Sequence, residues 1–375
     1  MQYLAWRAVL SRSAPRRGLA GIAFPKPPPS GVAALASRGL LSLTGPQATE
    51  FLHNITSARV KASDGIPPPA GIYAGIFSPQ GRLQYDVFLY PLRGSKLQQE
   101  EDGYLIETDH DRLSSLEALV KKYGKFSKIK ARVLSPDEAS VWHAWDDSSS
   151  LPNLGPTDQR IVLKDPRAPG LGCRVIQLNN QAPEVDLDAS SEAAYIVRRY
   201  LHGVPEGPEE LPFDEAMPIE NNMDLMNGID FHKGCYLGQE LIIRTRHRGQ
   251  VRKRLLPCVI YGKDKAIVSP QSLAYNGDDA SLGSIDASMI PTGTSIGPYD
   301  KRRPAGKWIK GVGNIGLALC RLEIMTDVRI SEATPSHRPE SSAADFSLEW
   351  GEEGKESMRV KAFVPQWLRD GLQAR

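Results

Sequence analysis

Residues 71–91, with the sequence GIYAGIFSPQGRLQYDVFLYP, constrain the fold more than any other stretch of this chain. They form two runs rich in aromatic and β-branched residues on either side of a Ser-Pro-Gln-Gly turn, a pattern that predicts two strands. The same composition predicts further strands at 104–109, 128–135 and 141–145. The first part of the chain is therefore expected to contain a β-sheet.

Three segments of the same region have apolar residues at helical spacing. One begins at Gly45-Pro46, because proline suits the first position of a helix. The others, residues 109–124 and 190–203, each end at a glycine, which is a common helix stop. Strands and helices together predict an α+β domain over residues 31–250, and the pattern leaves the strand order open.

The chain after residue 250 has a different pattern. It contains three apolar runs typical of strands, at 252–262, 313–324 and 358–368. Residues 263–305 are rich in Gly, Ser, Asp and Pro, and residues 331–357 contain seven acidic residues. We expect both to be polar insertions in a second, smaller all-β unit over residues 251–375.

The first 30 residues differ again, because they contain five basic residues and no acidic one; the first carboxylate of the chain is Glu50. An arginine-rich, serine-containing, acid-free start is typical of a mitochondrial presequence. Residues 1–30 are therefore interpreted as a targeting segment, with a disordered basic tail as the alternative. A secretory signal fits worse, because Arg7 and Arg12 interrupt any apolar core. No run of about 18 apolar residues occurs, so no membrane span is expected.

Four cysteines, Cys173, Cys235, Cys258 and Cys320, are far apart, and no Cys-x-x-Cys occurs. This spacing argues against a zinc knuckle and a disulfide scaffold and favours free thiols in a reducing compartment. Three of the cysteines lie in apolar, strand-like contexts and are expected to be buried.

Cys235 differs from the other three cysteines. It lies between glycines 234 and 238, at or just before a segment with helical spacing. A helix N-terminus and the nearby Lys233 would both favour a thiolate, the form that acts as a nucleophile or a metal ligand.

A basic run follows, in which six basic residues lie within eleven positions without an acid: Arg244, Arg246, Arg248, Arg252, Lys253 and Arg254. The run is either a solvated face with a linker between domains, or a site for a polyanion or for the acidic patch of a partner. Binding of RNA would favour interleaved aromatic residues, and none occurs between Tyr236 and Tyr261. With a formal net charge of only +2 for the whole chain, the pattern counts against nucleic acid as the partner.

The octapeptide KGCYLGQE, residues 233–240, resembles the signature of the folate-binding iron–sulfur cluster maturation proteins. These belong to the glycine-cleavage T-protein (aminomethyltransferase) superfamily. Residues 218–255, 37–60 and 313–324 resemble the same family, so the likeness covers most of residues 31–375 except the insertions. Together with the presequence, the resemblance is to the mitochondrial members of the family.

The resemblance implies a T-protein-like α+β domain built around a central cavity, followed by a small C-terminal β-barrel. It implies late assembly of [4Fe–4S] clusters in the mitochondrial matrix, with A-type scaffold proteins as partners. Client apoproteins would include aconitase and the radical-SAM lipoate and biotin synthases. The functional residue carried over is Cys235, framed by the rest of the motif: Lys233, Gly234, Tyr236, Gly238, Gln239 and Glu240.

The ligand count adds to this interpretation. A [2Fe–2S] cluster takes four protein ligands, usually thiolates, and Cys235 has no other thiol nearby in the sequence. We therefore expect Cys235 to share a transient cluster with a partner protein. Such a cluster would be labile, which suits a transfer factor, and Lys233 and the arginines could attract an acidic partner or the anionic cluster.

Folate chemistry is the alternative function. Catalytic aminomethyltransferases carry an Asp-Asp pair after the glycine of the early hairpin, whereas here Gly81 is followed by RLQY and only then by Asp86. This departure counts against aminomethyl transfer and favours a non-catalytic assembly factor. If tetrahydrofolate binds, Glu220 is a candidate for the pterin, and Arg244 or Arg246 for the glutamyl tail. An internal hydrogen bond or ion pair is the alternative role for Glu220.

Overall fold

The computed structural model describes residues 24–61, 71–98, 103–148, 154–179, 181–248, 250–264, 268–297, 304–328, 346–352 and 356–374. Most of the expected presequence, residues 1–23, lies outside this part of the chain. Residues 24–29 already contact the folded protein: the Trp145 indole N–H donates to the carbonyl O of Pro28 at 2.9 Å, and the Asp147 N–H donates to that of Pro29 at 2.8 Å. The folded chain thus begins before residue 31.

The hairpin predicted from residues 71–91 forms the edge of a five-stranded antiparallel sheet with the order β3-β4-β5-β2-β6. The strands that the sequence predicted in this region are confirmed, and β2 joins them between β5 and β6. Their bounds are β2 Arg38–Thr44, β3 Ile72–Phe77, β4 Leu83–Pro91, β5 Gly103–Asp109 and β6 Lys130–Val133.

Two helices, α2 (Ala48–Ile55) and α3 (Leu113–Tyr123), cover one face of this sheet. A short 3₁₀ turn, His110–Arg112, precedes α3. The helix expected at Pro46 begins two residues later, at Ala48. Buried Leu52 and Leu116 pack against sheet residues, as their helical spacing predicted.

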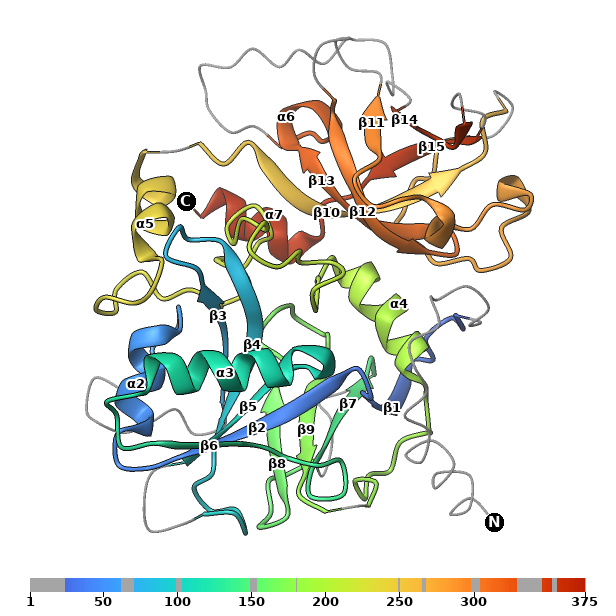
Figure 1. Cartoon of the computed structure of the whole chain (residues 1–375). Coiled ribbons are helices and arrows are strands. Elements are labelled where there is room, and N and C mark those ends of the chain that lie inside the picture. Colours follow the sequence, from blue (N-terminus) through green and yellow to red (C-terminus); the bar gives the residue numbers. More distant parts are fainter. Residues whose placement is uncertain are drawn as a thin grey trace.

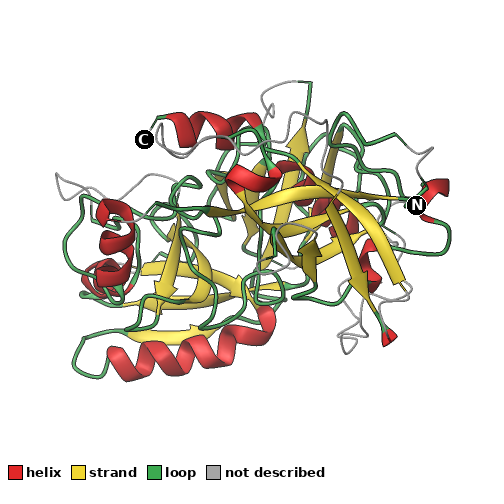
Figure 2. Ribbon diagram, turned by 90° about the horizontal axis from the view of Figure 1, so that it is seen from above, coloured by secondary structure: helices red, strands yellow, loops and turns green. Residues whose placement is uncertain are grey.

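A four-stranded antiparallel sheet with the order β1-β7-β9-β8 packs against the other face of the five-stranded sheet. Its strands are β1 Ser30–Ala34, β7 Ser140–Asp146, β8 Arg160–Lys164 and β9 Cys173–Gln177. The shared core contains Phe88 and Tyr90 from one sheet and Trp145 and Ile176 from the other. Figure 2 shows the strands in the middle of the molecule and most helices at its periphery.

The helix predicted over residues 190–203 is α4, Glu192–His202. The Ser191 hydroxyl accepts a hydrogen bond from the Ala194 N–H at 3.1 Å, and Gly203 ends the helix in the left-handed region with φ 71°. The two sheets and the helices packed on them form the first domain, which we call the two-sheet domain. Helix α4 contacts both this domain and the C-terminal unit (Figure 1).

The C-terminal unit is a closed barrel with the order β10-β13-β12-β11-β14-β15, which confirms the expected barrel. Its strands are β10 Lys253–Tyr261, β11 Ser295–Gly297, β12 Gly306–Val312, β13 Ile315–Arg321, β14 Phe346–Trp350 and β15 Glu356–Ala362. A short helix α6, Leu322–Met325, follows β13. Helix α7, Gln366–Gln373, follows β15, where the sequence pattern predicted only the end of a strand.

The two predicted insertions belong partly to the barrel itself. Residues 263–305 include strand β11 and two 3₁₀ turns, η2 (Ala280–Leu282) and η3 (Ala287–Met289), and they bury Leu282 and Ile296. Residues 346–350 form β14 and residues 356–357 begin β15, while 331–345 and 353–355 lie outside the described residues. The polar composition hid these elements because each contributes only a few apolar residues to the core. Within the described residues, no helix is long and apolar enough to cross a membrane.

Candidate functional site

The predicted motif forms a loop, residues 231–238, that leads into helix α5, Gln239–Arg248. We call residues 231–238 the cysteine loop. Lys233 and Tyr236 are buried, whereas Gly234 and Cys235 between them are exposed. The loop therefore holds a free thiol at the surface between two anchors that point inward.

Lys233 forms the first anchor. Its ammonium group donates hydrogen bonds to three backbone carbonyl oxygens, those of His53, Thr56 (2.7 Å) and Ala58 (3.0 Å). These carbonyls lie at the C-terminal end of α2 and just beyond it, where the helix dipole favours a cation. Burial lowers the pKa of Lys233 to about 8. All three donors of the ammonium are thereby satisfied by a segment 175 to 180 residues away in the sequence.

Tyr236 and Gly238 form the second anchor. The Tyr236 ring packs near Phe77 of β3, with 6.1 Å between ring centroids. Gly238 has φ +75°, and a Cβ there would lie 2.3 Å from the Ser78 carbonyl O. Only glycine fits such a close approach in the left-handed region. The cysteine loop thus packs between the C-terminal end of α2 and the turn that joins β3 to β4.

The sequence predicted that a helix N-terminus and Lys233 would together favour a thiolate at Cys235, and the structure does not show this arrangement. Helix α5 begins at Gln239, four positions after the cysteine, and the Lys233 ammonium faces carbonyl groups instead of the thiol. Neither the N-terminus of α5 nor the Lys233 ammonium is therefore placed next to the Cys235 sulfur. The structure presents an accessible sulfur on a fixed loop, and Glu240 lies exposed in the first turn of α5.

The other three cysteines are less accessible. Cys258 and Cys320 are buried in the barrel, as their sequence context predicted. Cys173 in β9 is half-buried, and burial raises the pKa of its thiol to about 11. Cys235 is thus the exposed cysteine of the chain. Among the described residues, no three His, Cys, Asp or Glu side chains gather in a way that could hold a metal ion.

The basic run divides into exposed and structural residues. Arg244 and Arg246 of α5 are exposed, and the Arg246 guanidinium lies 3.9 Å from the centroid of the Phe231 ring in the cysteine loop. Arg252 is also exposed, but Arg254 is buried and paired with Asp224 at 2.7 Å. Arg254 therefore helps to hold β10 to the first domain and is not part of a surface patch.

The residues suggested for folate are not joined by a hydrogen bond or ion pair among the described residues. Glu220 is half-buried, and within the described residues no hydrogen bond or ion pair joins its carboxylate to Arg244 or Arg246. Its backbone carbonyl accepts a hydrogen bond from the Leu255 N–H at 2.8 Å, which ties residues 217–222 to the barrel. An internal ion pair of the Glu220 carboxylate, the alternative considered from the sequence, is likewise not present among these residues.

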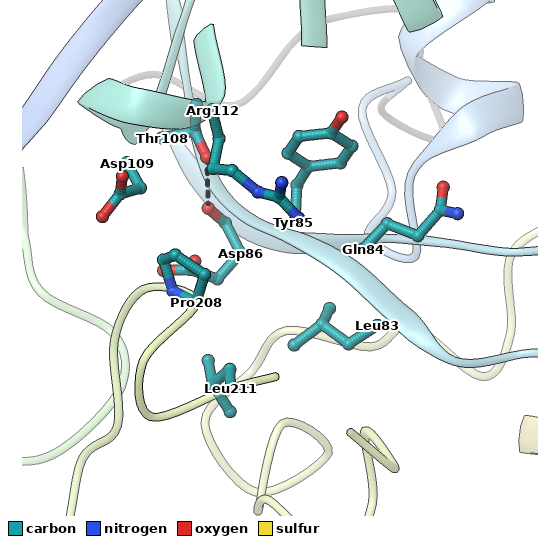
Figure 3. A pocket seen from close by; sticks show the side chains of 9 residues that line it. All are labelled: Leu83, Gln84, Tyr85, Asp86, Thr108, Asp109, Arg112, Pro208 and Leu211. Atoms are coloured by element: carbon teal, nitrogen blue, oxygen red, sulfur yellow. Dashed lines mark hydrogen bonds between the residues drawn. The ribbon is translucent and has the colours of Figure 1, made fainter. Parts of the chain in front are cut away.

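Asp86 of β4 is buried and paired with Arg38 at 3.2 Å. Burial raises the pKa of Asp86, while Arg38 opposes the shift. A small hollow lies beside it, lined by Leu83, Gln84, Tyr85, Asp86, Thr108, Asp109, Arg112, Pro208 and Leu211 (Figure 3). Its water-accessible volume is about 10 Å³, which is room for about one water molecule and far too little to enclose a drug-sized ligand.

A network of buried charges, which sequence reasoning missed, fills the interior near this hollow. Arg38 also pairs with Glu107 at 2.9 Å, and Glu206 accepts hydrogen bonds from Arg167 at 2.7 Å and from Arg174. Burial alone would raise the pKa of Glu206, but the arginines hold it well below its ordinary value. The partners lie on different strands and loops, so no local motif could reveal the network.

Comparisons with known proteins agree with this architecture. The family model described as "CAF17, C-terminal beta-barrel domain" matches residues 252–370. A solved structure of the glycine cleavage system aminomethyltransferase T from Bartonella henselae is similar, with a TM-score of 0.61 over 92% of this chain and 87% of that one. At 11% identity, this likeness shows the fold: a T-protein-like α+β domain followed by a β-barrel.

Curated relatives extend the comparison to the sequence. A protein of Pyricularia oryzae named "Iron-sulfur cluster assembly factor IBA57 homolog, mitochondrial" is 44% identical over 92% of this chain and 86% of its own length. The Chaetomium globosum protein of the same name is 40% identical over 98% of this chain and 92% of its own. This chain therefore belongs to the family of mitochondrial iron–sulfur cluster assembly factors.

Proposed function

We propose that this protein acts late in the assembly of [4Fe–4S] clusters in the mitochondrial matrix, with Cys235 as a ligand to a transient [2Fe–2S] cluster. The observation that carries the proposal is the exposed thiol on the doubly anchored cysteine loop. The names of the curated relatives, which are iron–sulfur cluster assembly factors, support the same role.

The coordination chemistry requires a partner. A [2Fe–2S] cluster takes four protein ligands, and the cysteine loop offers one thiolate. An A-type scaffold protein would supply the remaining ligands, so the cluster would lie between the two chains. Separation of the chains leaves the cluster incompletely held, which favours its transfer to client apoproteins such as aconitase and the lipoate and biotin synthases.

The electrostatics of the site favour an acidic partner. Exposed Arg244 and Arg246 follow the cysteine loop on α5, and Arg252 is exposed farther along the chain. Opposite charges on a partner would speed the encounter and orient the two chains. Because the cluster itself is anionic when bound by thiolates, the same arginines would also stabilise it.

The test is anaerobic mixing of this protein with an A-type scaffold protein loaded with a [2Fe–2S] cluster. We expect a visible absorption and circular dichroism spectrum that differs from that of the scaffold alone, and a stable complex on size exclusion. Cys235→Ala should lose both the new spectrum and the reactivation of apo-aconitase.

The matched control is Cys173→Ala, which removes the other partly accessible thiol of the chain. This variant should behave like the wild type, because burial keeps the Cys173 thiol protonated. A shared cluster that forms equally well with Cys235→Ala would refute the proposal, and so would its loss in Cys173→Ala alone.

The fold is consistent with involvement of a folate, and tetrahydrofolate is the candidate ligand to test. The hollow beside Asp86 is small, and it is not lined by Glu220, Arg244 or Arg246. Isothermal titration with tetrahydrofolate checks this point. Saturable binding that Glu220→Gln weakens would show that folate is a ligand of this protein, although aminomethyl transfer would still lack the Asp-Asp pair.

A further inference from the structure

The turn between α3 and β6 carries an unusual concentration of positive charge. Residues 121–130, KKYGKFSKIK, contain five lysines, and all five are exposed. We call residues 121–130 the lysine turn. No acidic residue occurs between Glu117 and Asp137 in the sequence. Glu117 pairs with Lys121 at 2.9 Å, so the other four lysines of the turn remain available to an outside partner.

Two aromatic side chains of the lysine turn project into solvent. Phe126 is 93% exposed and Tyr123 is 40% exposed. Apolar area that folding leaves in water gains free energy when a partner covers it, so these two rings offer a contact to an apolar surface. The Lys125 ammonium lies 5.7 Å from the centroid of the Phe126 ring, so cationic and aromatic groups share the tip of the turn.

The backbone of the lysine turn is held in place. The N–H of Gly124 donates to the Val120 carbonyl O at 2.7 Å, and the N–H of Ser127 donates to the Gly124 carbonyl O at 2.9 Å. The N–H of Lys128 donates to the Gln47 side chain, just before α2, at 2.7 Å. Phe126 is thus presented at the surface by a fixed turn, which lowers the entropy cost of binding.

We propose that the lysine turn binds the surface of an anionic phospholipid bilayer. Phe126 would enter the interface between headgroups and acyl chains, as aromatic residues do at membrane surfaces. The surrounding lysines would lie at the phosphate groups, where each basic residue near an anionic surface strengthens binding about fivefold. This proposal is independent of the iron–sulfur function.

The shape and composition of the lysine turn favour a bilayer over other anionic partners. Single-stranded nucleic acids bind in grooves that follow the backbone and carry stacking platforms, whereas Phe126 is 93% exposed on a turn. Protein–protein interfaces are depleted in lysine relative to the rest of the surface. A flat, deformable anionic surface suits an exposed ring with lysines on both sides of it in the sequence.

The position of the turn leaves the cysteine loop accessible. The lysine turn contacts the start of α2 through Gln47, and the cysteine loop contacts its end through the carbonyls of His53 and Thr56. Helix α2 has 8 residues and is therefore about 12 Å long. The lysine turn and the cysteine loop thus contact opposite ends of α2, and the proposed membrane contact does not involve the cysteine loop.

The experiment is co-sedimentation of the full chain with vesicles made of equal parts phosphatidylcholine and phosphatidylglycerol, and with vesicles of phosphatidylcholine alone. We expect binding to the anionic vesicles only, and weaker binding at high salt. Lys125→Glu/Lys128→Glu should reduce the affinity at least about 25-fold. Phe126→Ser should reduce it about tenfold by removing the inserted ring.

Matched controls come from the barrel. Lys263→Glu/Lys307→Glu makes the same change in net charge at two other exposed lysines, and Met289→Ser removes an apolar side chain that is 58% exposed. Both should bind vesicles like the wild type. Because residues 1–30 are also basic, all variants are compared in the full chain.

Equal binding by the lysine-turn variants and the wild type would overturn the proposal, and so would absence of binding to anionic vesicles. Fluorescence anisotropy with a labelled single-stranded RNA distinguishes the remaining case. If the lysine-turn variants lose affinity for RNA while the wild type ignores vesicles, the turn is a nucleic-acid site and not a membrane site.

Discussion

Cys235 and Lys233 are two positions apart in the sequence, yet the fold uses them in opposite ways. The lysine, which would ordinarily be exposed, is buried against three carbonyl groups, and the cysteine, which would ordinarily be buried, is exposed. This inversion of normal burial is what marks the residues as a site. A thiol that gains nothing from packing in its own chain is available to a partner.

His143 allows a test of the interior at the scale of one residue. It is fully buried in β7, where its Nε2 lies 3.0 Å from the Leu171 carbonyl O. Burial, reinforced by Arg174, lowers its pKa from 6.5 to about 3. Below pH 6.5 the unfolded chain therefore binds a proton that the folded chain does not bind.

The free energy of unfolding should thus fall as the pH decreases from 6.5 towards 3, and this residue contributes about 1.4 kcal/mol per pH unit. Urea denaturation across this range measures the slope. His143→Gln keeps a donor for Leu171 and should give a flatter pH dependence. An unchanged slope in the variant would show that His143 does not titrate in this way.

At the scale of the element, the cysteine loop depends on its glycines unequally. A Cβ at Gly238 would lie 2.3 Å from the Ser78 carbonyl O, and φ there is +75°. Gly234 has nothing within 4 Å of such a Cβ and does not lie in the left-handed region. The two glycines of one motif therefore have different physical roles.

Gly238→Ala should lower the free energy of unfolding by about 1–3 kcal/mol, because the backbone must shift away from the β3–β4 turn. Gly234→Ala should change it by less than about 0.5 kcal/mol. Thermal unfolding followed by circular dichroism compares the two variants. Equal destabilisation by both would contradict the anchoring of the loop at Gly238.

At the scale of the whole molecule, the two-sheet domain and the barrel are joined through α7 and α4. Trp367 of α7 packs against the cores of both domains, and its indole N–H donates to the carbonyl O of His202 at 3.0 Å. Buried Arg254 adds a second connection through its ion pair with Asp224. The domains should therefore unfold together.

Trp367→Ala should lower the unfolding free energy by about 3 kcal/mol and split the single calorimetric transition into two. Loss of the shared packing uncouples the barrel from the first domain, so the less stable unit melts earlier. Gln366→Ala, at the exposed neighbouring position, is the control. A single transition in Trp367→Ala would mean that other contacts suffice to couple the domains.

Local elements of this fold were predictable because they follow from periodicity and turn chemistry. The β3–β4 hairpin, α3, α4 and the barrel strands β10 and β13 all lie where apolar spacing predicted them. Strand β11 was missed because three residues are too few for a periodic signal. Helix α7 was missed although Leu368 and Leu372 have helical spacing, because its apolar residues follow closely on those of β15 and were read as the end of that strand. The motif itself was visible as a family resemblance, and Cys235 stood out by its two flanking glycines.

The sequence by itself indicated an α+β part followed by an all-β part and singled out Cys235 by its flanking glycines, since composition and spacing are local properties of a chain. The exposure of Cys235 came from the tertiary structure. Only the tertiary structure decided what Lys233 touches, that Arg254 is buried, and that α7 joins the two cores. These contacts join segments far apart in the sequence. Every residue has a backbone carbonyl, so the sequence cannot indicate which carbonyls accept a hydrogen bond from Lys233. Only the three-dimensional structure identifies them.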